Sequence, residues 1–204
     1  MGLYIIQMHR RDMADPAPIF HTFVTMNERH NIVFLSLGSN RGDRMEALRT
    51  AEKLIAERIG AVTGRSPVVE SGPWGFTDDT LFLNDVLEVR TSLSPHEILQ
   101  VAGEIEEEMG RERKVPVYDE WGKRVYSARI MDIDILFYND VILESKELTI
   151  PHPAISIRRF VLAPFSMFRP GFVHPVLKKT MREMLDECPD KSEVRVIEDL
   201  RKER

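Results

Sequence analysis

The chain has 204 residues, of which 43% are hydrophobic and 30% are charged, and this composition is typical of one globular domain with a proper core. Its formal net charge is −5, from 28 basic and 33 acidic residues, so no basic surplus is present to bind a nucleic-acid backbone. The single cysteine, Cys188, excludes an internal disulfide, and no apolar stretch approaches the roughly 20 residues of a membrane span. We therefore expect a cytoplasmic protein with neither a nucleic-acid nor a membrane partner.

The first predicted elements are a strand, a helix and a second strand. Residues 1–30 show no sustained periodicity, so we expect a loosely ordered N-terminal extension. Residues 32–37 form a compact apolar run that ends in Gly38-Ser39-Asn40, which is typical of a buried strand entering a turn. Apolar residues recur at helical spacing over residues 44–59, and residues 62–70 predict the second strand.

The middle of the chain predicts a strand, a helix and a long loop. The run Gly72-Pro73-Trp74-Gly75 predicts a stiff loop, and residues 82–91 alternate well enough for a third strand. Ser94 opens a capping box with proline at the first helical position, which predicts a helix to about residue 109. Residues 111–128 are highly charged and lack an apolar period, so they predict a long loop of the kind that is usually functional or disordered.

The last elements are a strand and two helices. Residues 130–138 predict a strand, and Asn139-Asp140 predicts a hairpin turn into residues 141–143. Helical stretches are predicted at residues 158–168 and 175–185. From residue 31 the order is β-α-β-β-α-β, which favours an α+β fold, a ferredoxin-like sandwich of one antiparallel sheet with additional C-terminal helices. We expect this domain to span residues 31–187, followed by a charged tail at residues 188–204.

The strongest local signal is RIMDIDIL at residues 129–136. Side chains alternate along a strand, so Asp132 and Asp134 are predicted on one face, about 6–7 Å apart. As bare anions they would repel by about 2–3 kcal/mol at an effective dielectric of about 20. A divalent cation removes this penalty, and few, hard oxygen ligands favour Mg²⁺ completed by substrate phosphates. The alternative interpretation is the solvated polar face of an exposed strand.

Cations accompany the two aspartates. Arg129 precedes them, and Arg111 and Arg113 open the long loop. Transfer from ATP needs a metal to bridge phosphate oxygens, guanidinium groups to neutralise charge, and a cover that excludes water. The charged loop at residues 111–128 and the strand that bears the two aspartates could together meet all three requirements. The alternative is a solvated loop with ordinary ion pairs.

Two further groups are candidates. His152, between two prolines, and Arg158, at a predicted helix start, could serve a ligand, although a structural histidine and a surface arginine are the plainer interpretations. An amide between aromatic faces suits a planar heterocycle with both hydrogen-bonding senses. The residues that could form such a slot are Trp74, Phe82, Asn84 and Phe160, with the phenylalanines as core residues in the alternative interpretation.

These motifs, in this order, resemble one family, 6-hydroxymethyl-7,8-dihydropterin pyrophosphokinase. The similarity covers residues 31–185, about three quarters of the chain. Its segments are LGSN at residues 37–40, GPWGF at 72–76, FLN at 82–84, GRER at 110–113, RIMDIDIL at 129–136, IPHP at 150–153 and RRFVL at 158–162.

The resemblance implies an enzyme that transfers pyrophosphate from ATP to the pterin hydroxymethyl group. We expect it to be a monomer. It implies that Asp132 and Asp134 hold two Mg²⁺ ions, while Arg111 and Arg129 clamp phosphates. The implied ATP contacts are Glu106, Arg113, His152 and Arg158. The implied pterin contacts are Ser71, Trp74, Phe82, Asn84, Phe160 and a loop aromatic, for which spacing favours Tyr126 over Trp121.

Two other functions are consistent with the residues alone. One is another Asp-x-Asp transferase that uses a nucleotide donor. The other is a catalytically silent module that binds a small ligand, although such a module needs neither paired aspartates on one face nor a long cationic loop beside them.

Overall fold

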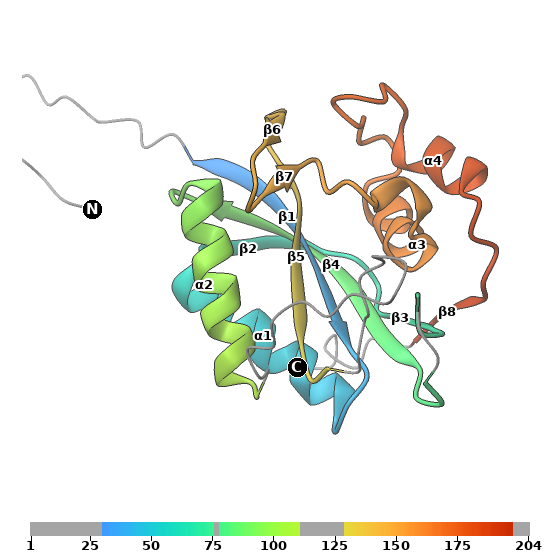
Figure 1. Cartoon of the computed structure of the whole chain (residues 1–204), viewed down its shortest axis with the longest axis horizontal. Coiled ribbons are helices and arrows are strands. Elements are labelled where there is room, and N and C mark those ends of the chain that lie inside the picture. The colour runs from blue at the N-terminus through green and yellow to red at the C-terminus, as the bar shows by residue number, and fades with distance from the viewer. Residues whose placement is uncertain (1–29, 76–77, 111–128, 198–204) are drawn as a thin grey trace, which may run out of the picture.

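The computed structural model describes residues 30–75, 78–110 and 129–197. These residues form a six-stranded antiparallel sheet covered by helices on both faces (Figure 1), with a separate two-stranded sheet beside it. No helix among them is both long enough and apolar enough to cross a membrane.

Strand β1 lies between two other strands in the interior of the sheet. It pairs with β4 on one side and β5 on the other, and β2 and β3 both pair with the far edge of β4. The short strand β8 adds to β3, so part of the expected C-terminal tail belongs to the sheet. The strands are β1 (Asn31–Ser39), β2 (Ala61–Arg65), β3 (Val69–Ser71), β4 (Phe82–Thr91), β5 (Asp132–Tyr138) and β8 (Val194–Val196).

The single strand predicted over residues 62–70 is wrong in one respect, because it is broken into β2 and β3. Pro67 lacks the N–H that a continuous ladder requires. Ser66 stands at the break, where its N–H donates to the carbonyl of Val86 (2.8 Å) and its Oγ accepts from the Val86 N–H (2.9 Å). The two halves therefore pair with β4 on either side of a side-chain bridge.

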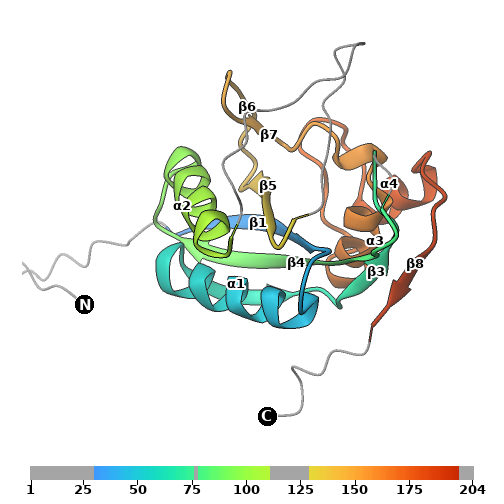
Figure 2. The same cartoon turned by 60° about the horizontal axis from the view of Figure 1, so that its bottom comes forward.

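One face of the sheet carries α1 (Arg44–Arg58) and α2 (Pro95–Glu108) (Figure 2). Asp43 caps α1 by accepting from the N–H of Glu46 (3.0 Å), and Ser94 forms the predicted capping box of α2. The helices pack a largely apolar layer against the sheet. Its members include Leu35, Leu37, Leu48, Ile55, Ile98, Ile105, Ile133 and Ile135.

The opposite face carries α3 (Arg159–Phe168) and α4 (Met181–Glu187) over an aromatic cluster. The cluster is Phe34, Phe137, Phe165 and Phe172, with ring centroids 4.7–6.4 Å apart. These helices do not cover the whole face. The part left beside the first residues of β5 forms the pocket described below.

The helix predicted over residues 175–185 is wrong at its beginning, because α4 starts only at Met181. His174 accepts at Nδ1 from the N–H groups of Val176 (3.2 Å) and Leu177 (3.1 Å), and Lys178 has a φ of 57°. This side-chain-capped turn satisfies the backbone groups that a longer helix would use.

The predicted hairpin is also wrong. Asn139 does form a turn, with a φ of 48°, but β6 (Leu143–Glu144) pairs with β7 (Thr149–Ile150) rather than with β5. Beyond β7 the N–H of His152 donates to the carbonyl of Leu136 (3.0 Å), so the returning chain takes this edge of β5. A short 3-10 turn, η1 (Ile155–Ile157), then leads into α3.

Candidate functional site

The sheet register gathers polar side chains from three strands on the face that carries α3. Directly paired residues share a face, and Gly38 of β1 pairs with Asn84 of β4 and Asp132 of β5, while Ser36 pairs with Asp134. The intervening Ile133 points into the core beneath α1 and α2. The expectation that both aspartates share one strand face is therefore confirmed.

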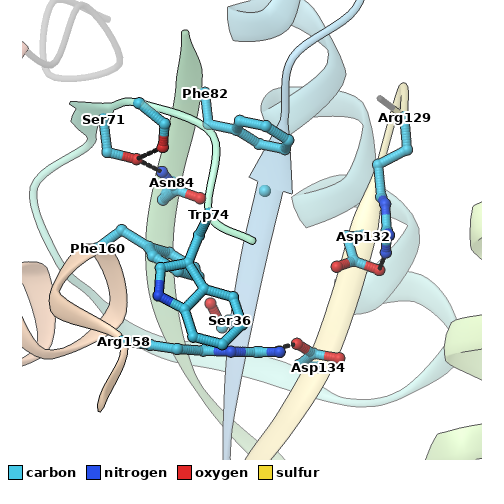
Figure 3. Close-up of a pocket in the computed structure, with 12 residues that line it drawn as sticks. Ser36, Ser71, Trp74, Phe82, Asn84, Arg129, Asp132, Asp134, Arg158 and Phe160 are labelled. Atoms are coloured by element: carbon cyan, nitrogen blue, oxygen red, sulfur yellow. Dashed lines mark hydrogen bonds and ion pairs between the residues drawn. The ribbon is translucent and has the colours of Figure 1, made fainter. Parts of the chain in front are cut away.

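These side chains line one pocket together with residues from the β3–β4 loop and the start of α3 (Figure 3). The sequence-predicted residues that line it are Ser71, Trp74, Phe82, Asn84, Arg129, Asp132, Asp134, Arg158 and Phe160. We refer to Asp132 and Asp134 as the acidic wall, and to Trp74, Phe82 and Phe160 as the aromatic wall.

Arginines neutralise both carboxylates of the acidic wall. Arg129 Nη1 lies 2.6 Å from Asp132 Oδ1, and Arg158 Nη1 lies 2.8 Å from Asp134 Oδ2. His152 Nε2 is 3.7 Å from the same Asp134 oxygen and 3.3 Å from Arg158 Nη1. The site therefore already balances two negative charges with two guanidinium groups.

The pKa of Asp134 reflects this competition. Burial pushes the pKa upward, but attraction by His152 and Arg158 outweighs burial and holds the pKa below its ordinary value. Burial also lowers the pKa of His152, so this ring is neutral near pH 7. We therefore attribute the ionised state of Asp134 mainly to Arg158, whose charge is permanent.

Across the pocket, the aromatic wall is joined to a polar edge. The Trp74 and Phe160 ring centroids are 6.4 Å apart, and the guanidinium carbon of Arg158 lies 5.2 Å and 5.8 Å from them. Asn84, which is buried, donates from Nδ2 to Ser71 Oγ (3.0 Å). This bond orients the amide, so that its oxygen remains as an acceptor beside aromatic faces.

The centre of the pocket floor is glycine for a steric reason. A Cβ at Gly38 would lie 3.1 Å from Asn84 Oδ1, so a larger residue would press on the amide. Sequence reasoning did not identify Ser36, Gly38 or Gly72 as lining residues. The signal was the alternation of Ser36 and Gly38 along β1, which becomes informative only when the pairing with Asp132 and Asp134 is known.

Two predicted ATP contacts lie behind or beside the pocket rather than in its lining. Glu106 of α2 is buried on the opposite side of β5, where its Oε1 accepts from the Ile133 N–H (2.7 Å), between the two aspartates. His152 contacts Asp134 from beyond β7. The predicted loop residues Arg111, Arg113, Tyr126 and Trp121 lie outside the described residues.

The acidic wall fits a magnesium site in which the substrate supplies some of the metal ligands. Within the described ranges, no group of three or more aspartate, glutamate, histidine or cysteine residues could form a closed metal cage. Two carboxylates that face one pocket, Asp132 and Asp134, are nevertheless the donor set that Mg²⁺ uses when water and phosphate oxygens complete its shell.

Comparison with known proteins agrees with this geometry. The chain is 38% identical over 156 residues to the "2-amino-4-hydroxy-6-hydroxymethyldihydropteridine pyrophosphokinase" of Aquifex aeolicus, covering 76% of this chain and 91% of that protein. It is 36% identical over 162 residues to the "Folic acid synthesis protein fol1" of Schizosaccharomyces pombe, where the match covers 79% of this chain but only 21% of the longer relative.

A solved structure supports the fold. The chain superposes on the Plasmodium falciparum HPPK-DHPS crystal structure with a TM-score of 0.60 at 21% identity, covering 80% of this chain and 45% of that one. The sequence profile of "7,8-dihydro-6-hydroxymethylpterin-pyrophosphokinase (HPPK)" matches residues 34–170, about two thirds of the chain. This protein belongs to the HPPK family.

Proposed function

We propose that this protein transfers the pyrophosphoryl group of ATP to the hydroxymethyl group of 6-hydroxymethyl-7,8-dihydropterin, giving AMP and the pterin diphosphate for folate biosynthesis. The observation that carries this proposal is a single pocket in which Asp132 and Asp134 face an aromatic wall with an oriented amide, Asn84. Family membership and the names of the relatives support the same reaction.

The acidic wall is the phosphate side of the proposed site. Asp132 and Asp134 would hold two Mg²⁺ ions together with the phosphates of ATP. Bound there, Mg²⁺ would neutralise phosphate charge and polarise the attacking oxygen. The low pKa of Asp134 suits this role, because the carboxylate is ionised and ready to accept a metal at neutral pH.

The aromatic wall is the pterin side. We infer that Trp74, Phe82 and Phe160 hold the faces of the ring, since planar heterocycles gain dispersion and quadrupole energy against aromatic side chains. The Asn84 amide and the groups around Ser71 would hydrogen-bond the ring edge. Tyr126 is proposed as the loop aromatic that covers the ring.

This placement supports the following reaction. The hydroxymethyl oxygen attacks the β-phosphorus, the bond from that phosphorus to the oxygen bridging to the α-phosphate breaks, and AMP leaves with the bonding electrons. The hydroxyl proton is released to solvent or to a phosphate oxygen. Arg129 and Arg158 supply guanidinium charge beside the phosphates, and we propose Arg111 and Arg113 as further phosphate cations.

Glu106 and His152 were predicted to contact ATP, but their positions favour an indirect role for each. Glu106 accepts from the Ile133 N–H, so we infer that it supports ATP binding by holding β5 from behind. His152 lies against Asp134 and Arg158, and it would influence ATP through both. Neither position requires the side chain to touch the nucleotide.

The wider organisation is proposed on the same basis. We propose a catalytic domain at residues 31–187, followed by the tail that contributes β8. The N-terminal extension expected before it lies, up to residue 29, outside the described residues. The antiparallel order β5-β1-β4, with β2 and β3 both beyond β4, supports the ferredoxin-like arrangement. We further propose a cytoplasmic monomer, in keeping with the single buried cysteine, Cys188.

The deciding experiment is a product assay with ATP, Mg²⁺ and 6-hydroxymethyl-7,8-dihydropterin. AMP that forms only when the pterin is present supports the proposal. ADP would instead indicate simple phosphoryl transfer by another nucleotide-dependent enzyme, and neither product would indicate a silent binding module. Asp140→Asn, an exposed change just beyond β5, serves as the matched control for carboxylate substitutions.

A further inference from the structure

We propose that Asn40 is a positioning residue that fixes Arg129, and through it the end of β5 that bears Asp132. Asn40 follows β1 directly and is fully buried. Its backbone N–H donates to the carbonyl of Arg129 (3.2 Å), and its side-chain Oδ1 accepts from the Arg129 N–H (2.8 Å). One asparagine thus satisfies both backbone groups of a residue 89 positions away in sequence.

This pair of bonds, which we call the Asn40 clamp, lies immediately before the acidic wall. Arg129 lines the pocket, and its Nη1 contacts Asp132 Oδ1 at 2.6 Å. The β1–β5 ladder ends where Gly38 pairs with Asp132. The Asn40 clamp therefore adds two hydrogen bonds between the same two segments beyond the last paired residues. The two bonds therefore tie the entry point of β5 to the end of β1.

The chemistry of the contact explains why asparagine is suited to the position. An N–H group can only donate, so the Asn40 side chain must present its oxygen to Arg129. The other side-chain atom, Nδ2, is buried and has no hydrogen-bond partner within the described part of the chain. Burying an amide nitrogen in this way lowers stability. The stabilising contribution of this side chain therefore comes from the hydrogen bond that its oxygen accepts.

The expected consequence is catalytic and rests on the proposed function. Arg129 and Asp132 both belong to the phosphate side of the pocket, and an error of about 1 Å in such groups can reduce the rate about 10²-fold. The aromatic wall is built from the β3–β4 loop, β4 and α3, none of which Asn40 holds. Loss of the clamp is therefore expected to lower kcat while changing the pterin KM little.

Kinetics of three variants test this split. Asn40→Ala is expected to lower kcat by about 10- to 100-fold with the pterin KM within about threefold of wild type. Asn40→Asp retains the acceptor and is expected to recover most of the lost kcat. Asn139→Gly is the matched control, because Asn139 Oδ1 accepts from the Ile32 N–H (2.8 Å) at the far end of β1, and glycine tolerates its positive φ.

A measurement that needs no activity separates this inference from the proposed function. In native-state hydrogen exchange, Asn40→Ala is expected to speed exchange of the Arg129 amide at least about tenfold, whereas Asn139→Gly should speed exchange at Ile32 instead. If wild type forms no AMP, the proposed function fails, and the exchange data still decide the clamp.

Either an unchanged Arg129 amide or a wild-type kcat in folded Asn40→Ala overturns the inference. Equal losses of kcat in Asn40→Ala and Asn139→Gly also overturn it, because they would show a general effect of weakening β1. Should Asn40→Ala fail to fold, Asn40→Ser decides the same two measurements with a smaller change in polarity.

Discussion

Arg158 connects the acidic wall of the pocket to the aromatic wall. Its Nη1 donates to Asp134 Oδ2 at 2.8 Å, while its guanidinium lies over the rings of Trp74 and Phe160 (Figure 3). Arg158 is only 8% exposed, so this pair is held largely away from water. A metal that binds Asp134 would share a carboxylate that an arginine already neutralises, and under the proposed function this guanidinium would lie beside the phosphates.

Asp134→Asn is expected to abolish turnover, with AMP formation reduced at least about 10³-fold, because a neutral amide is a poor Mg²⁺ ligand. It also leaves Arg158 without its counter-ion. Since the Asp134 side chain is one-third exposed, we expect a loss of only about 1–2 kcal/mol in the free energy of unfolding. Product assays and urea unfolding measure the two effects. A variant with normal AMP formation would remove Asp134 from the site.

Arg111→Ala is expected to slow catalysis more than it weakens pterin binding, because a phosphate cation stabilises the charge that develops during transfer. We expect kcat to fall at least about tenfold, with the pterin Kd within about threefold of wild type. Arg49→Ala, on the exposed face of α1, is the control for loss of a positive charge. Equal losses in both variants would indicate an effect of overall charge alone.

Trp74→Ala is expected to weaken pterin binding about tenfold while ATP binding stays near wild type, because the indole forms a face of the aromatic wall. Trp74→Phe retains an aromatic face and should lose less. Equilibrium titration with pterin and with a non-hydrolysable ATP analogue distinguishes the two sides. An equal loss for both ligands would contradict the assignment of Trp74 to the pterin side.

Arg44→Ala is expected to disturb the pterin side from outside the pocket. Arg44 Nη1 donates to Glu70 Oε1 (2.9 Å) and to the carbonyl of Leu81 (2.8 Å), so it ties the start of α1 to both ends of the β3–β4 loop. Because Arg44 is about 29% exposed, we expect a stability loss of about 1 kcal/mol, with a raised pterin KM. An unchanged KM in a destabilised variant would assign the contact to stability alone.

His174 predicts a pH dependence of stability. Burial lowers its pKa below the ordinary value of 6.5, so the unfolded chain binds a proton more readily than the folded protein does. Stability is therefore full above about pH 6.5 and falls as the pH drops below it. His174→Asn retains an acceptor for the Val176 N–H without titrating, so unfolding free energies at about pH 7.5 and about pH 5 should differ less in this variant. An unchanged difference would exclude His174 as a cause.

The sequence predicted the structure best where only neighbouring residues along the chain determine it. The alternation of Asp132 and Asp134 placed both on one face, and Ser94 marked the start of α2 through a capping box that needs only local residues. It was least informative where the partner is remote. Ser36 becomes a pocket residue only through its pairing with Asp134, and Glu106 lies behind β5 because of the face on which α2 packs.

Local competition accounts for the remaining errors. Residues 62–70 were predicted as one strand, but Pro67 cannot donate to the ladder, and the strand divides there. The helix predicted from Pro175 likewise begins too early, because the His174 side chain accepts from the first N–H groups and α4 begins only at Met181. Periodicity in the sequence does not report a missing backbone N–H or a side-chain bond to the backbone.

The connection between β1 and α1 has a geometric consequence. Asn40 at its beginning holds the segment that leads to Asp132, and Arg44 at its end holds the loop that carries Trp74. The few peptide units between them therefore connect the side of the pocket that bears the acidic wall to the side that bears the aromatic wall. Under the proposed function, this one turn therefore contacts both the segment that precedes the metal-binding carboxylates and the loop that carries the ring-stacking indole.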